Sequence, residues 1–182
     1  MPNAPAPASV RIAVLPVSDT RDEETDTSGR LLAERLIQDG HVLAAKLIIK
    51  DDAKHIESTV TAWMQDESID VVIATGGTGI TFRDVTVDVF ERLYTKPIPG
   101  FGELFRMLSY REIGTSTIQS RASGGLAGTT LLFALPGSTS AVRMGWDDIL
   151  TFQLNSTHRP CNLVDLMPRF GAGCGNAKPP SP

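Results

Sequence analysis

The sequence contains little cysteine and no long hydrophobic run. Its two cysteines, Cys161 and Cys174, both lie near the C-terminus, so we expect no disulfide framework and predict a reducing compartment. No apolar run approaches the roughly 20 residues that a membrane-spanning helix needs. Residues 1–9 also lack the basic and apolar regions of a secretory signal. These absences predict a cytoplasmic protein without membrane contact.

An excess of positive charge is absent as well. The net charge is −4 and the pI is near 5.3, and the 17 lysines and arginines are scattered singly along the chain. This distribution predicts no nucleic-acid partner. The three histidines, His41, His55 and His158, are isolated from one another, which indicates surface or structural roles. Any anionic ligand must therefore be bound by local groups.

The length of 182 residues, with 41% hydrophobic content, is typical of a single globular domain. Residues 1–9 are rich in proline and alanine, and we expect them to form a flexible N-terminal arm. Residues 10–170 would form the folded domain. Residues 171–182, where Gly, Pro, Ala and Ser dominate, would form a flexible tail.

Short apolar segments alternate with amphipathic ones along the domain. Strands buried on both faces, separated by helices, require right-handed crossovers. We therefore expect an α/β fold, a three-layer α/β/α sandwich with a mostly parallel central sheet. A loop or hairpin with further glycines is expected at residues 120–128. The pattern predicts strands at residues 12–17, 42–49, 71–75, 118–119 and 129–135, and helices at residues 26–39, 56–64, 85–94, 101–108 and 139–150.

The segment after the predicted strand at residues 71–75 is the most informative one. The apolar run ends in Thr75-Gly76-Gly77-Thr78-Gly79, and Arg83-Asp84 follows. Closely spaced glycines permit positive φ angles and let backbone N–H groups approach an anion. The spacing matches neither the Walker loop nor the dinucleotide fingerprint, so a tight turn without a ligand is the alternative. Arg83 and Asp84 favour a ligand, because they bring a cation and a carboxylate to the same rim.

In open α/β sheets, ligands bind at the carboxyl ends of the strands, where the loops after the predicted strands should converge. Asp51 and Asp52 lie in one of these loops, and one of them is expected to cap the following helix. The other is then free. Together with Asp84 it would suit Mg²⁺, which takes one or two carboxylates plus phosphate oxygens and waters.

Two further segments place polar groups beside glycines. In Pro99-Gly100-Phe101-Gly102-Glu103, the glycines would let a helix N-terminus face an anion, with Glu103 as a base or orienting group. A kinked connection before a helix is the alternative. Arg121 follows Ser120 and precedes a glycine-rich turn, which suits phosphate capture by a planar guanidinium. Polarity at a strand edge is the alternative there.

Taken in order, these motifs closely resemble the molybdopterin-binding family of molybdenum cofactor biosynthesis over roughly residues 11–170. Segments 105–109, 112–117 and 159–162 are similar to the B-type branch of that family rather than to its adenylyltransferase branch or the gephyrin domain. The motifs that carry the resemblance are Thr75-Gly76-Gly77-Thr78-Gly79, Arg83-Asp84-Val85-Thr86, Pro99-Gly100-Phe101-Gly102-Glu103, Ser120-Arg121-Ala122 and Leu135-Pro136-Gly137-Ser138.

The resemblance implies an α/β sandwich that assembles as a trimer or a hexamer and binds molybdopterin. In the adenylyltransferase branch, the molybdopterin phosphate attacks the α-phosphorus of Mg-ATP, which releases pyrophosphate and leaves adenylyl-molybdopterin. By resemblance, Asp84 and either Asp51 or Asp52 would hold Mg²⁺ and orient the phosphates. The residues that would bind the pterin, its phosphate or ATP are Thr75, Gly76, Gly77, Thr78, Gly79, Gly100, Gly102, Glu103, Ser120, Arg121, Pro136, Gly137 and Ser138.

Two functions remain open at this point. The first is a molybdopterin adenylyltransferase, whose chemistry needs positioning and charge neutralisation rather than a covalent nucleophile. The second is a protein that binds or delivers molybdopterin without adenylylating it. The adenylyltransferase-like form of Arg83-Asp84-Val85-Thr86 favours the enzyme. A nicotinamide-dependent oxidoreductase is disfavoured, because the dinucleotide fingerprint is missing.

Overall fold

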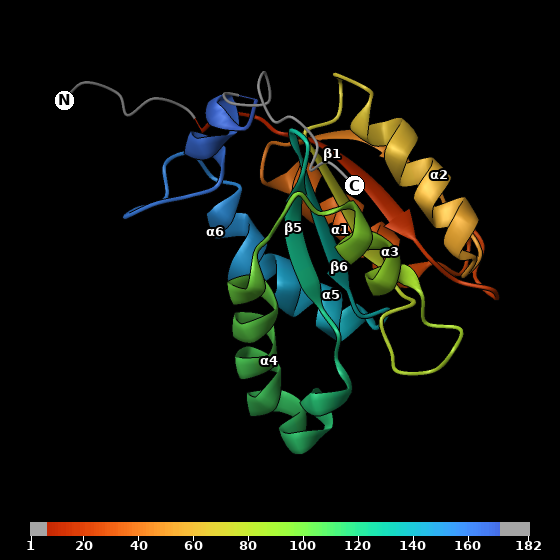
Figure 1. Ribbon diagram of the computed structural model, residues 1–182. Helices are drawn as coiled ribbons and strands as arrows, with labels where there is room; N and C mark the ends of the chain where they lie inside the picture. The colour runs from red at the N-terminus through yellow and green to blue at the C-terminus, as the bar shows by residue number, and fades with distance from the viewer. Residues whose placement is uncertain (1–6, 172–182) are drawn as a thin grey trace, which may run out of the picture.

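A single sheet of six strands lies at the centre of the computed structural model, which describes residues 7–171 (Figure 1). The strand order is β2-β1-β3-β6-β5-β4. The first four strands in this order are parallel, β5 is antiparallel to β6, and β4 is antiparallel to β5. The expected mostly parallel sheet is confirmed. The strands are β1 (Arg11–Pro16), β2 (Val42–Lys46), β3 (Val71–Thr75), β4 (Lys96–Pro97), β5 (Ser123–Ala127) and β6 (Thr130–Leu135).

Helices cover both faces of this sheet. Figure 1 shows α2 and α3 on one side of the strands and α4 and α5 on the other. One apolar core joins the sheet to α1, α4 and α5, and a second joins it to α2 and α3. The three-layer sandwich is therefore confirmed. The helical segments are α1 (Thr27–Gln38), α2 (Ala53–Met64), α3 (Thr86–Leu93), α4 (Pro99–Ile113), η1 (Gly114–Gln119), α5 (Thr139–Gly145), η2 (Trp146–Leu150), α6 (Thr151–Gln153) and η3 (Val164–Arg169).

The two cores follow from the period of a strand, in which successive side chains point to opposite faces. In β1, Ile12 and Val14 belong to the core under α1, whereas Ala13 and Leu15 belong to the core under α2. All four side chains are fully buried. A continuous apolar run in a strand therefore fills both layers, which holds the ends of the central strands in fixed positions.

Two expectations about strands were wrong. The segment at residues 42–49 is a strand only over Val42–Lys46, and Val42 is 50% exposed, because β2 is at the edge of the sheet and pairs only with β1. Ile118 belongs to the 3₁₀ segment η1 rather than to a strand, and its side chain is 82% exposed. Residues 123–127, which were expected to belong to a loop or hairpin, form the strand β5, which pairs with β6 across a turn at Gly128, whose φ is +61°.

Side-chain caps set the starts of two helices that lead away from the sheet edge. The carboxylate of Asp26 accepts a hydrogen bond from the Gly29 N–H at 2.8 Å, which begins α1 as the sequence indicates. The Ser138 hydroxyl accepts one from the Ala141 N–H at 3.2 Å and begins α5. Within residues 7–171, none of the helices has the length and apolar character needed to cross a membrane. Residues 1–6 of the predicted arm and residues 172–182 of the predicted tail lie outside the described residues.

Candidate functional site

Three parallel strands end side by side at one edge of the sheet. Pro16 of β1, Thr75 of β3 and Leu135 of β6 are in register. The Val17 N–H donates to the Thr75 carbonyl at 2.8 Å, and the Gly76 N–H donates to the Leu135 carbonyl at 3.0 Å. The loops that follow these strands therefore meet at this edge, as the strand order predicts.

The glycine loop after β3 lies too close to its neighbours to carry side chains. Gly76 has a φ of +102°, and a Cβ placed on it would be 2.2 Å from the Val17 carbonyl oxygen. Gly77 has a φ of +61°, and its Cβ would be 2.2 Å from Thr86 Oγ1 and 2.8 Å from Asp51 Oδ1. These positions need glycine for both the backbone angle and the space. The loop consequently brings its main chain against Asp51 and Thr86.

The structure distinguishes the two aspartates after β2. The Asp52 carboxylate accepts a hydrogen bond from the His55 N–H at 2.8 Å and caps α2. Asp51 is left facing the glycine loop, where it accepts a long hydrogen bond of 3.4 Å from the Val85 N–H. Burial raises the pKa of Asp51, and the negative charges of Asp84 and Asp19 raise it further. Asp51 is therefore the available carboxylate of the pair, and Asp52 is occupied as a helix cap.

Asp84 is held inside its own loop. Its Oδ2 accepts hydrogen bonds from Thr81 Oγ1 at 2.6 Å and from the Thr81 N–H at 2.9 Å. The hydrogen bond from the Thr81 hydroxyl lowers the pKa of Asp84, and the backbone amides of Thr81 and Gly79 contribute in the same direction. The two carboxylates of this edge thus have pKa values that shift in opposite directions. The structure leaves Asp84 ionised and fixed in orientation.

Thr86 supplies an oxygen without a protein partner beside these carboxylates. Its side chain is fully buried at the start of α3, and its Oγ1 makes no hydrogen bond within residues 7–171. Buried hydroxyls are usually hydrogen bonded, so this oxygen keeps the capacity to bind one further group. The same oxygen lies against Gly77, next to Asp51. Asp51 and Thr86 therefore present oxygen atoms to the same point of the glycine loop.

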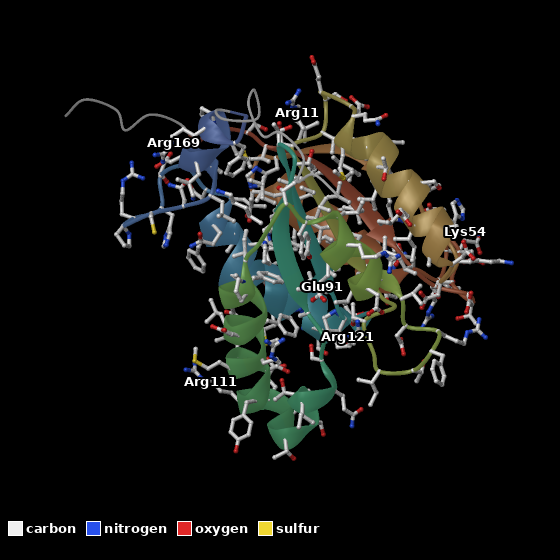
Figure 2. The ribbon with its side chains drawn as sticks, in the orientation of Figure 1. Arg11, Lys54, Glu91, Arg111, Arg121 and Arg169 are labelled. Atoms are coloured by element: carbon white, nitrogen blue, oxygen red, sulfur yellow. The ribbon has the colours of Figure 1, made fainter. Side chains whose placement is uncertain are left out.

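A polar pocket of about 490 Å³ opens between α3, α4 and β5. Four of the predicted ligand residues line it, together with Arg106 and Glu91. Figure 2 shows Glu91 and Arg121 close together on one face of the molecule, beside α3 and β5. The pocket therefore combines two guanidinium groups with two carboxylates. The predicted residues in it are Gly102, Glu103, Ser120 and Arg121.

A chain of hydroxyls orients Glu91 in this pocket. The hydroxyl of the half-buried Tyr94 donates to Ser123 Oγ at 3.3 Å, and Ser123 Oγ donates to Glu91 Oε1 at 3.2 Å. Burial raises the pKa of Tyr94, so its proton stays in place. The Tyr94 ring fits only because Gly125 has no side chain, since a Cβ there would be 2.4 Å from the ring. The glycines of β5 thus support the pocket wall from behind.

A smaller pocket of about 130 Å³ lies between the end of β1 and the start of α1. Thr75 and Gly137 line it, with Ser18, Arg21 and Ser28. Gly137 packs directly on the glycine loop, because its Cβ would be 3.2 Å from Gly76 Cα. The predicted ligand residues are therefore divided: four line the larger pocket, Thr75 and Gly137 line the smaller one, and residues 76–79 line neither.

Three other predicted ligand residues lie outside both pockets. Gly100 borders a separate apolar pocket of about 180 Å³, whereas Gly102 lines the polar one. The two glycines are two residues apart on α4, and at about 100° per residue such positions face in nearly opposite directions. The Pro136 carbonyl accepts the hydrogen bond of Thr75 Oγ1 at 3.1 Å. Ser138 Oγ is the cap of α5. Each of the last two therefore has a structural contact at the site edge.

Known proteins decide which family this arrangement belongs to. The family model described as "Probable molybdopterin binding domain" matches residues 13–156. Molybdenum cofactor biosynthesis protein B of Escherichia coli strain K12 is 47% identical over 153 residues, which is 84% of this chain and 90% of that protein. The chain belongs to the molybdopterin-binding family of molybdenum cofactor biosynthesis proteins.

Solved structures of this family support the assignment. A crystal structure of molybdenum cofactor biosynthesis protein B superposes with a TM-score of 0.82 at 43% identity, covering 91% of this chain and 98% of that chain. The tungsten cofactor synthesizing protein MoaB from Pyrococcus furiosus gives a TM-score of 0.68 at 37% identity, covering 80% of this chain and 93% of that one. The resemblance to the B-type branch of the molybdopterin-binding family is confirmed by these names.

The motifs of the family did not indicate every polar residue around the site. Asp88 and Glu91 lie in α3, and Arg106 and Ser123 line the polar pocket. A signal for the first two was present, because residues 88 and 91 are spaced by three and fall on one side of the helix that begins shortly after Asp84. The glycine loop and α3 together therefore form a larger acidic surface than the loop alone predicted.

Proposed function

We propose that the protein binds molybdopterin and transfers the adenylyl group of ATP to its terminal phosphate. The observation that carries this proposal is the approach of Asp51 and Asp84 to one glycine loop, which is joined to the larger pocket by Arg121 and to the smaller one by Thr75. A reaction between two substrates needs two binding regions that meet at a shared centre. The fold and the relatives support membership of the pathway, and the adenylylation step is our proposal.

In this proposal the larger pocket holds the pterin. A pterin carries an amino group and a ring N–H side by side, and a carboxylate accepts both at once. Glu91 is the carboxylate best fixed for this role, because Ser123 Oγ donates to it. Replacing Glu91 by Gln should weaken molybdopterin binding about tenfold, measured by anaerobic fluorescence titration. Glu57→Gln, on α2, is a matched control.

The reaction in this proposal is a displacement at phosphorus. An oxygen of the molybdopterin phosphate forms a bond to the α-phosphorus of ATP, and the bond from that phosphorus to the bridging oxygen breaks, so that pyrophosphate leaves. The glycine loop would supply backbone N–H groups to the phosphates. Asp51 and Asp84 would orient the reacting groups by their fixed charges. Neither needs to give or take a proton, because both substrates react as anions.

The residues fit Mg²⁺ carried by the nucleotide. Oxygen donors are what Mg²⁺ prefers, and the site offers Asp51, Asp84 and the orphaned Thr86 hydroxyl. Within residues 7–171, no cluster of three or more His, Cys, Asp or Glu could hold a metal alone. The three protein oxygens of Asp51, Asp84 and Thr86 suit an ion whose remaining ligands are waters and phosphate oxygens. When bound, Mg²⁺ would neutralise the charge that develops on the phosphate oxygens.

The test measures pyrophosphate release from Mg-ATP in the presence of molybdopterin. Asp84→Asn should abolish turnover while molybdopterin still binds, because the amide oxygen can still accept from Thr81 while the charge is lost. Thr81→Ala is the matched control, since it removes the hydroxyl that anchors Asp84 but keeps both carboxylates. Absence of release by the wild type, beside an active adenylyltransferase, would refute the catalytic proposal.

The alternative is a protein that holds or delivers molybdopterin without adenylylating it. The similarity to proteins named B, rather than to an adenylyltransferase, favours this second candidate. It predicts that molybdopterin binds with the same affinity whether or not Mg-ATP is present. Titration of molybdopterin at several ATP concentrations distinguishes the two candidates. For the enzyme, the Kd of molybdopterin should change with the ATP concentration, because the two substrates bind at neighbouring sites.

We also propose that the protein assembles as a trimer or a hexamer. The support is an exposed apolar group on α4 and η1, a kind of surface that monomers seldom leave uncovered. Sedimentation velocity measures the assembly directly, and a monomer at micromolar concentration would contradict it. The exposed side chains are Met107, Tyr110, Ile113 and Ile118, with exposed fractions of 54%, 58%, 52% and 82%.

A further inference from the structure

Arg121 spans the two ends of the loop that carries Asp84. Its Nη1 donates to the Gly79 carbonyl at 3.3 Å and, more weakly, to the Asp84 carbonyl at 3.5 Å. Its Nη2 donates to Asp88 Oδ1 at 2.5 Å. The side chain comes from the residue before Ala122 and β5, so it reaches the loop from a distant part of the sequence. One guanidinium thus connects the start of the loop, its end and the first turn of α3.

The loop between Gly79 and Asp84 has few other attachments. Ile80 is 69% exposed and Phe82 is fully exposed, so these two side chains at the tip project into solvent. Figure 1 shows this segment, in yellow-green, projecting away from the sheet beside α3. Within residues 7–171, Asp19 and Arg121 are the side chains outside the loop that hydrogen bond to it, and Asp19 does so through exposed Arg83. Arg121 is therefore the main link between loop and body.

We propose that Asp88 is a positioning residue that acts through Arg121 to hold this loop, and with it Asp84. Among residues 7–171, Arg121 is the ion-pair and side-chain hydrogen-bond partner of Asp88. A planar guanidinium can bond two groups in its plane, which a lysine ammonium cannot match. Asp88 fixes the plane of the Arg121 guanidinium, so that Nη1 faces the carbonyls of Gly79 and Asp84. The effect on turnover rests on the proposed adenylyl transfer, whereas the effect on the loop does not.

The loop contains a direct reporter of its own mobility, the Arg83–Asp84 bond, which trypsin can cut. Cleavage in a native protein follows the fraction of molecules in which the segment is locally open. Asp88→Ala and Asp88→Asn should raise the initial rate of cleavage at this bond about threefold to fivefold, the effect of losing one partly exposed ion pair. Intact-mass spectrometry identifies the fragment that begins at Asp84.

Two variants show whether the geometry or the charge matters. Asp88→Glu keeps the carboxylate and should restore slow cleavage. Arg121→Lys keeps the charge but loses the planar fork, and it should raise cleavage as Asp88→Asn does. Glu57→Gln is the control. It removes the ion-pair partner of Arg92, which lies on α3 as Asp88 does, at an Nη2–Oε2 distance of 3.8 Å, and this pair does not involve the loop. Equal melting temperatures of all variants would show that the opening is local.

The second readout is the kinetics of pyrophosphate release. Asp88→Asn should lower kcat about threefold to fivefold, in step with cleavage, and leave the KM for molybdopterin unchanged. If cleavage at Arg83 is the same in wild type, Asp88→Asn and Arg121→Lys, the positioning role is overturned. A wild type that releases no pyrophosphate but shows the cleavage differences would overturn the proposed function and leave the loop contact standing.

Discussion

Substitution of Gly77 by alanine separates two costs that usually occur together. Gly77 and Gly128 both have a φ of +61°, so alanine meets the same backbone strain at each position. At Gly128 nothing lies within 4 Å of the added Cβ. At Gly77 the Cβ would be 2.2 Å from Thr86 Oγ1 and 2.8 Å from Asp51 Oδ1. The difference between the two variants therefore measures the crowding at the glycine loop alone.

The magnitudes follow from these contacts. Alanine in the left-handed region lowers the free energy of unfolding by about 1–2 kcal/mol. About 0.4–1 kcal/mol of this loss is offset, because alanine reduces the conformational entropy of the unfolded chain. Gly128→Ala should therefore cost about 1 kcal/mol. Gly77→Ala adds overpacking of about 1–3 kcal/mol, because Thr86 is fully buried and cannot move aside freely. For a chain of this size, 1 kcal/mol lowers Tm by about 2–4 °C.

The assay is thermal unfolding of both variants at one protein concentration. We expect Tm to fall by about 2–4 °C for Gly128→Ala and by about 4–16 °C for Gly77→Ala. Adding Thr86→Ala to Gly77→Ala should recover part of the loss, because the nearest oxygen is removed. Equal losses in the two single variants would refute the reasoning, since the close contacts would then carry no free energy.

Burial lowers the pKa of His41 by more than the charge of Asp39 raises it. The unfolded state therefore binds a proton more readily than the folded state. The free energy of unfolding should be highest above about pH 6.5 and should decline below it. Urea unfolding across pH should show this slope in the wild type and lose it in His41→Gln. Burial opposes the charge of Asp70, but the hydrogen bonds and charge of Arg11 outweigh it and lower the pKa of Asp70. That stabilisation should be present above about pH 4 and disappear as the pH falls through the lower folded value; Asp70→Asn should be less stable at pH 7 and flatter in acid. Ser138→Ala should lower the free energy of unfolding in urea by about 1 kcal/mol, because it removes the oxygen that caps α5. Ser138→Asp should restore this stability, because a carboxylate oxygen can cap the helix as the hydroxyl does. Equal stability of the two variants would contradict the cap.

The sequence predicted the parts of the fold that depend on local patterns. The continuous apolar strand at residues 71–75 and the helix expected at residues 26–39 were both found where expected. The dipeptide Ile118–Gln119 was misassigned, because two residues cannot distinguish a strand from a turn of helix. The strand at residues 42–49 was too long, because the pattern does not reveal that β2 lies at the edge of the sheet.

The candidate site shows the same limit. One aspartate after β2 was expected to cap a helix, but only the contact with the His55 N–H shows that it is Asp52. The pairing of Arg121 with Asp88 joins positions far apart in the sequence, and no local motif records it. The roles of these residues in binding and catalysis stay predictions until turnover and affinity are measured.

The exposed tip of the loop after Gly79 has an evolutionary consequence. Its two ends are attached through main-chain carbonyls, which every residue type supplies. The side chains of Ile80 and Phe82 make no core contact, being 69% and fully exposed. Mutations at these two positions can therefore accumulate without a stability penalty, while they alter the surface that an incoming molecule meets first. The fold thus offers selection a place to adjust recognition separately from folding.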